Sequence, residues 1–97
     1  MTIGACRIVL RLPENASLKG KRQVIKSLIT RVRNRYNVSI AEIDHQDSWQ
    51  IASLGLTCVS NSSRHVSETL EKVVGFVRHS RLDAEMLDAQ IELVEAL

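Results

Sequence analysis

The chain is poor in cysteine, proline and aromatic residues. Its 97 positions hold only two cysteines, one proline and three aromatic side chains. Cys6 and Cys58 lie far apart in the sequence, and neither belongs to a Cys-x-x-Cys pair, which argues against a disulfide framework. We therefore predict two buried free thiols that behave as small hydrophobic side chains.

Long apolar runs are also missing. No run approaches the length of about 18 residues that a membrane-spanning helix needs. The first seven residues lack the basic and then apolar build of a signal peptide. We therefore expect a soluble, cytoplasmic protein without a membrane association.

The remaining composition is that of an ordinary globular protein, with 44% hydrophobic and 25% charged residues. The length predicts one domain over residues 1–97. The charge is distributed unevenly. Residues 1–36 hold nine Lys or Arg and one acid, Glu14, whereas residues 37–97 hold four basic and ten acidic residues. Such an asymmetry indicates a basic interaction surface in the first part of the chain.

The spacing of apolar residues divides the chain into six elements. It predicts, in order, a strand over residues 3–12, a helix over 18–36, strands over 38–43 and 48–59, a helix over 64–80 and a strand over 84–94. Ser17 is a candidate N-cap of the first helix. Apolar parity changes within the third strand, which predicts a bulge near Ala52 and Ser53. In the last strand, Leu87, Ala89, Ile91 and Leu93 share one face.

This order of elements is βαββαβ. Right-handed crossovers place both helices on one face of a four-stranded antiparallel sheet. We therefore predict a ferredoxin-like α+β fold with the first and third strands in the centre. The other face of the sheet stays open and carries Arg7 and Arg11.

The first helix carries the clearest functional signal. At about 100° per residue, one flank of its apolar stripe gathers four cations within a band of about 60°. These cations are Lys19, Arg22, Lys26 and Arg33. No acid lies at an i±4 position within the helix. The flank is therefore either a solvated surface whose charges pair with acids of the second half, or a phosphate-binding surface.

The start of this helix sharpens the second interpretation. Lys19, Lys21 and Arg22 occupy the first turns, where the helix dipole disfavours an exposed cation by roughly 0.3–1 kcal/mol. Free backbone N–H groups and cations at a helix start attract anions. In the predicted central strands, residues 3–12 and 54–59 carry no aromatic side chain on which a base could stack, so we expect RNA to be held by the helix rather than by the sheet.

The segment Asp44-His45-Gln46-Asp47 concentrates two carboxylates and an imidazole. It is either a divalent-metal or acid–base site, or a hairpin turn whose side chains bond to their own backbone. A metal needs three or four convergent ligands, and no second ligand cluster appears in the sequence. No catalytic signature and no cofactor motif were found.

Three segments carry a family resemblance: residues 10–14 running into 17–22, residues 38–47, and residues 59–61. They read Leu-Arg-Leu-Pro-Glu with Ser-Leu-Lys-Gly-Lys-Arg, Val-Ser-Ile-Ala-Glu-Ile-Asp-His-Gln-Asp, and Val-Ser-Asn. Over about residues 3–94 the chain resembles the YlxP-like family of small bacterial proteins of unknown function. The resemblance implies a ferredoxin-like fold. Members are often encoded beside transcription and translation factors, which implies by association a role near ribosome assembly. The family has no established catalytic residues to transfer.

Three hypotheses about function follow. The first is a non-enzymatic factor that binds rRNA or a ribosomal subunit through phosphate contacts from Lys19, Lys21, Arg22, Lys26 and Arg33, extended by Arg7 and Arg11. The second is a homodimeric interaction module that pairs through the open sheet face. The third and weakest is an enzyme centred on Asp44, His45 and Asp47.

Overall fold

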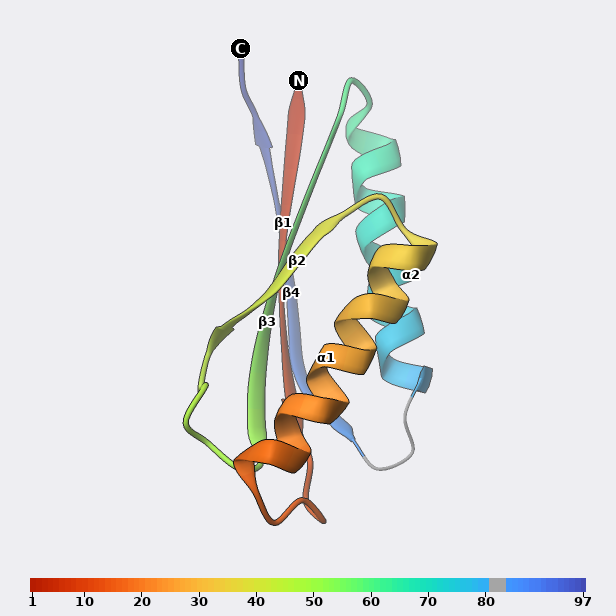
Figure 1. The fold of residues 1–97 in the computed structure, drawn as a ribbon. Coiled ribbons are helices and arrows are strands. Elements are labelled where there is room, and N and C mark those ends of the chain that lie inside the picture. The colour runs from red at the N-terminus through yellow and green to blue at the C-terminus, as the bar shows by residue number, and fades with distance from the viewer. Residues whose placement is uncertain (81–83) are drawn as a thin grey trace.

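A computed structural model of the chain describes residues 1–80 and 84–97. The elements are β1 (Thr2–Arg11), α1 (Leu18–Arg35), β2 (Ser39–Asp44), β3 (Ile51–Ser60), α2 (Ser63–Ser80) and β4 (Glu85–Glu95). The strands form one antiparallel sheet in the order β2-β3-β1-β4, and both helices lie on one side of it (Figure 1). The predicted ferredoxin-like α+β fold is confirmed.

Strand β1 lies in the centre of the sheet, between β3 and β4. Every second side chain of β1 is buried, from Thr2 through Ile8 to Leu10, because these positions face the helices. The strand pairs with β3 without interruption from Thr2 opposite Ser60 to Arg11 opposite Ile51. Its other edge pairs with β4.

One apolar core lies between the sheet and the helices. Side chains of β1, β2 and β3 meet the inner faces of both helices there. Its fully buried members include Ile8, Leu12, Leu28, Val32, Ile40, Leu54, Leu56, Val66, Leu70 and Val73. Each large aliphatic side chain buried in this way stabilises the fold by about 1.5–3 kcal/mol relative to an exposed one.

Helix α1 begins and ends as its sequence requires. Ser17 has an extended backbone, and its Oγ accepts a hydrogen bond from the Gly20 N–H at 3.0 Å, which confirms the predicted N-cap. The helix ends where the Tyr36 N–H bonds to the Val32 carbonyl. The Tyr36 ring then packs edge-on against Phe76 of α2, with ring centroids 5.8 Å apart.

Two bulges differ from the predictions. The register between β2 and β3 shifts between Glu42 and Asp44, so the bulge lies in β2 at Ile43 and not at Ala52 and Ser53. The change of parity was misleading because β3 begins at Ile51, and Trp49 belongs to the preceding turn.

The second bulge lies in β4. Val9 faces Asp88 and Leu10 faces Met86, which leaves Leu87 without a partner in β1. Met86 therefore turns toward the core in its place, and Leu87 is largely exposed. The prediction that Leu87 shares one face with Ala89, Ile91 and Leu93 was wrong for this reason.

Both cysteines are free thiols. Cys6 is buried as predicted, whereas Cys58 is only half-buried. Burial raises the pKa of the Cys6 thiol to about 11, and the charges of Glu71 and Cys58 add to the effect. Burial also raises the pKa of Cys58. Among the described residues, no helix is long and apolar enough to cross a membrane.

Glycine is required where α2 crosses β1 most closely. A Cβ atom on Gly4 would lie 2.4 Å from Val66 Cγ1 and 2.7 Å from Leu70 Cδ1, whereas one on Gly75 of α2 would meet nothing within 4 Å. We predict that Gly4→Ala lowers the free energy of unfolding by about 1–3 kcal/mol, because the core cannot expand cheaply. Gly75→Ala is the matched control and should raise it by about 0.5–1 kcal/mol. Urea unfolding of both variants checks this, and equal midpoints would contradict it.

Candidate nucleic-acid interface

Four cations form the surface that we call the basic flank, defined as Lys19, Arg22, Lys26 and Arg33. All four side chains are exposed, as the helical spacing predicted. The basic flank lies on the side of α1 that faces β2. A groove of about 280 Å³ runs there, lined by Arg22, Lys26 and Arg33 together with Glu42 of β2. The Arg33 guanidinium donates a hydrogen bond of 2.9 Å to the Ile40 carbonyl, which fixes it beside the groove.

The basic flank has no acidic partners within residues 1–80 and 84–97. The ion pairs of that part of the chain join Arg11 to Glu85, Lys21 to Glu42 and Arg64 to Glu68. None of them involves a member of the basic flank. The alternative in which these four charges pair with acids of the second half is therefore not what the described residues form.

The cations on the opposite flank of α1 are used differently. The guanidinium carbons of Arg31 and Arg35 lie 5.5 Å and 5.1 Å from the centroid of the Phe76 ring. Arg31 also donates to the Ser80 carbonyl at the end of α2. Arginine over an aromatic face is attracted by the ring quadrupole. These two cations therefore hold α1 against α2.

Lys21 requires a correction. It was predicted to contact phosphate, but its side chain is completely buried, with 0% exposed. Its Nζ lies 3.1 Å from Glu42 Oε2 and donates to the carbonyls of His45 at 2.7 Å and Ile51 at 3.1 Å. The Gln46 carbonyl is a longer contact at 3.4 Å. Lys21 is thus an internal cation that joins α1 to β2 and to the turn that follows it.

The turn between β2 and β3 is closed by its own polar groups. Asp44 Oδ1 accepts from the His45 N–H at 2.8 Å, and His45 adopts a positive φ of 61°. The His45 Nδ1 atom lies 2.8 Å from the hydroxyl of buried Ser53. Ser48 Oγ accepts from the Ile51 N–H at 3.0 Å. These contacts are those expected of a hairpin turn whose side chains bond to their own backbone.

The side chains of Asp44, His45 and Asp47, the possible polar site, do not converge on one point in this turn. Asp44 bonds to the backbone and His45 bonds to Ser53. Asp47 is exposed to solvent. Within the described ranges, no group of three or more His, Cys, Asp or Glu side chains could hold a metal ion.

The rest of the turn is tied to the segment before α1. Asn15 Nδ2 donates to the carbonyls of Ser17 and Trp49. Gln50 Nε2 donates to the carbonyls of Pro13 at 3.1 Å and Asn15 at 3.4 Å. The Trp49 carbonyl accepts the Asn15 hydrogen bond, and 57% of the residue is exposed.

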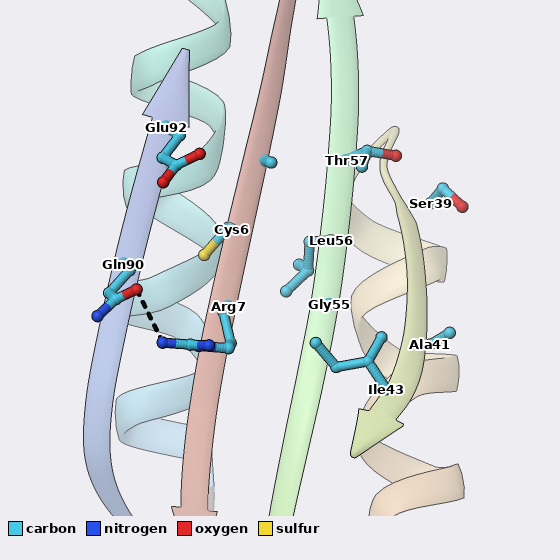
Figure 2. Close-up of a pocket in the computed structure, with 11 residues that line it drawn as sticks. Cys6, Arg7, Ser39, Ala41, Ile43, Gly55, Leu56, Thr57, Gln90 and Glu92 are labelled. Atoms are coloured by element: carbon cyan, nitrogen blue, oxygen red, sulfur yellow. Dashed lines mark hydrogen bonds between the residues drawn. The ribbon is translucent and has the colours of Figure 1, made fainter. Parts of the chain in front are cut away.

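Arg7 and Arg11 lie on the open face of the sheet, opposite the helices. They therefore do not extend the basic flank as one continuous surface, which corrects the prediction. Figure 2 shows the Arg7 guanidinium reaching to Gln90, whose Oε1 accepts its hydrogen bond at 2.9 Å. Arg11 pairs with Glu85 at 4.0 Å. A shallow groove of about 410 Å³ crosses this face, with Ile43 folded over Gly55.

The sequence reasoning missed Glu42 and Trp49. A signal for the role of Lys21 and Glu42 was present, because Lys21 falls on the apolar stripe of α1, three residues after Leu18 and four before Ile25. A cation on the buried side of a helix needs a buried acceptor. No comparable signal existed for Trp49, since its exposure depends on where β3 begins.

Comparison with known proteins identifies a family of unknown function. A family model described as a protein of unknown function (DUF503) matches residues 3–91. An uncharacterized protein YlxP of Bacillus subtilis (strain 168) is 48% identical over 61 residues. That match spans 63% of this chain and 66% of the relative, just under two thirds of its length.

The buried position of Lys21 can be tested against its exposed neighbour Lys19. We predict that Lys21→Met lowers the free energy of unfolding by about 2–4 kcal/mol, because it leaves Glu42 and the carbonyls of the turn without their cation. Lys19→Met should change it by less than about 0.5 kcal/mol, since that side chain is in solvent. Urea denaturation of the two variants measures the difference. Similar losses in both would refute the role of the buried ammonium.

Proposed function

We propose that this chain, which belongs to the DUF503 family of proteins of unknown function, is a non-enzymatic cytoplasmic factor that binds RNA. The partner is rRNA or a ribosomal subunit, and the contacts are to phosphates along the basic flank of α1. The observation that carries the proposal is the lack of acidic partners for Lys19, Arg22, Lys26 and Arg33 among the described residues.

The argument is electrostatic. Four exposed positive charges on one side of a helix repel each other, and a bound polyanion relieves that repulsion. Phosphate contacts also release counterions, so four of them predict a slope of log affinity against log salt of about −3 to −4. Such contacts supply affinity without reading the base sequence.

The rest of the helix supports this assignment. The other cations of α1 have partners inside the molecule: Lys21 binds Glu42, and Arg31 and Arg35 lie over Phe76. The basic flank is the group of cations on α1 that has neither a buried ion pair nor an aromatic ring as partner among the described residues. Arg33 is partly fixed by its bond to the Ile40 carbonyl, which reduces the entropy that binding would cost.

Charge reversal tests the proposal. We expect the unmodified chain to co-sediment with ribosomal subunits and to bind structured RNA at low salt. The triple variant Arg22→Glu, Lys26→Glu, Arg33→Glu should lose affinity by at least about tenfold, because the reversed charges repel phosphate. The matched control reverses Arg64, Lys72 and Arg78, which are exposed on α2. Absence of binding at low salt, or equal losses in the two triple variants, would refute the proposal.

A second candidate function is self-association through the open sheet face. Ile3, Val59 and Val94 are exposed and lie side by side across three strands, because Ile3 pairs with both Val59 and Val94. The four strands hold between six and eleven residues each, and their face covers roughly 600 Å² per copy. Two copies would then bury about 1,200 Å², the lower bound for a stable interface.

The charges on this face also favour a second copy as the occupant. Arg7 bonds only to the neutral Gln90, and Glu92 lies on the same face without an ion pair among the described residues. A two-fold axis through the face would bring Arg7 of each copy toward Glu92 of the other. The face is thus complementary to itself.

Two neighbouring residues of β4 provide the test. Val94 is 52% exposed on the open face, and Leu93 is 44% exposed on the face toward α2, where it lies near Gly4. We predict that Val94→Lys weakens dimerisation by about tenfold or more, since it places a charge in the apolar row. Leu93→Lys should leave the dimer intact. Sedimentation velocity distinguishes these outcomes, and an unmodified chain that stays monomeric at high concentration would refute the candidate.

A further inference from the structure

The indole of Trp49 is presented to solvent. Trp49 is the only tryptophan of the chain, and 57% of it is exposed. A large aromatic side chain left outside a core is a common feature of recognition surfaces. Neither the core nor the groove on the sheet uses it.

The backbone around this exposed ring is braced at several points. Lys21 Nζ binds the His45 carbonyl before Trp49 and the Ile51 carbonyl after it. Asn15 Nδ2 binds the carbonyl of Trp49 itself. The turn therefore holds the backbone of Trp49 in place, while more than half of the residue is exposed. Such preorganisation lowers the entropy cost of binding a ligand on the ring.

These hydrogen bonds from Lys21 and Asn15 also determine where Trp49 lies in the structure. Asn15 precedes α1 and Lys21 is in its second turn, so the turn of Trp49 lies against the start of α1, at the lower end of the molecule in Figure 1. The basic flank begins in the same two turns with Lys19 and Arg22. An exposed aromatic ring and cations without an ion pair among the described residues thus lie at the same end of the structure.

We propose that Trp49 stacks on an unpaired base of single-stranded RNA whose backbone follows the basic flank of α1. The inference rests on the proposed function and narrows it to RNA with unpaired nucleotides. Cationic grooves with an aromatic platform are how proteins bind single strands, because every base offers a flat face and every nucleotide a phosphate. A duplex has its bases stacked inside and offers the ring no partner.

Tryptophan is also common in protein–protein interfaces. The neighbouring cations decide between the two partners, because they would be buried without partners against an uncharged protein surface. A polyanion with exposed bases satisfies both the ring and the cations.

The single tryptophan makes a direct experiment possible. The unmodified chain is titrated with a single-stranded oligouridylate and, separately, with a duplex RNA of the same charge, while the intrinsic fluorescence is recorded. We expect saturable quenching with the single strand, since stacking changes the surroundings of the only indole. The duplex should bind with little change in fluorescence.

Variants measured by fluorescence anisotropy of labelled RNA complete the test. Trp49→Ala should weaken single-strand binding by about 5- to 150-fold and leave duplex binding unchanged. Trp49→Phe should retain most of the affinity, because a phenyl ring still stacks. Ile43→Ala, which removes another exposed apolar side chain, is the control and should bind like the unmodified chain.

The outcomes separate the two proposals. If neither RNA binds at low salt, the proposed function is wrong and this inference falls with it. If both RNAs bind and depend on the basic flank, but Trp49→Ala has no effect and no quenching occurs, only the stacking inference is overturned. An equal loss of single-strand and duplex binding in Trp49→Ala also overturns it, as does a change in oligomeric state with unchanged RNA binding.

Discussion

The buried ammonium of Lys21 is the contact on which the arrangement of α1, β2 and the β2–β3 turn depends. A fully buried charge is costly unless ion pairing and hydrogen bonds replace its hydration. Here Glu42 supplies the opposite charge, and the carbonyls of His45 and Ile51 accept hydrogen bonds from the Lys21 ammonium. The His45 carbonyl also accepts the Ser48 N–H, so Lys21 adds a second hydrogen bond to a group that helps to close the turn. Each group thus makes the burial of the others acceptable.

The same helix shows that basic residues can serve three purposes. Lys21 is internal, and Arg31 and Arg35 lie over the Phe76 ring. Within the described residues, the members of the basic flank form no ion pair and lie over no aromatic ring. A count of positive charges treats these cations alike, whereas their angular position around α1 separates them. The excess charge of the first part of the chain therefore overstates the surface that a polyanion can reach.

Most of the fold could be predicted because its signals are local and repeat along the chain. Alternation in β1 and helical spacing in α2 place the apolar residues of each element on the inner face, and Ser17 marks the start of α1. The bulges at Ile43 and Leu87 could not be placed, because register depends on the partner strand and not on the strand alone. The same limit applies to Trp49, whose exposure follows from the residue at which β3 begins.

The candidate site was predictable only in its outline. Helical spacing identified the basic flank, but it could not show that Lys21 turns inward, because that depends on an acid in β2. Nor could it separate Arg7 and Arg11 from the basic flank, since the sheet lies between them. The position of Lys21 on the apolar stripe indicated the buried side of α1, but its acceptors in β2 and in the turn could not be identified from the helix alone.

The separation of the two surfaces has a consequence for the two proposed functions. The helices cover one face of the sheet (Figure 1). The exposed row of Ile3, Val59 and Val94 lies on the other face, because the buried positions of β1 alternate with Ile3. A dimer formed through the open face would leave α1 of both copies pointing outward. Such a dimer would carry two basic flanks on opposite sides. One RNA that reached both flanks would bind more tightly than either flank allows, because the second contact becomes intramolecular. Self-association and phosphate binding would then reinforce each other rather than compete for one surface.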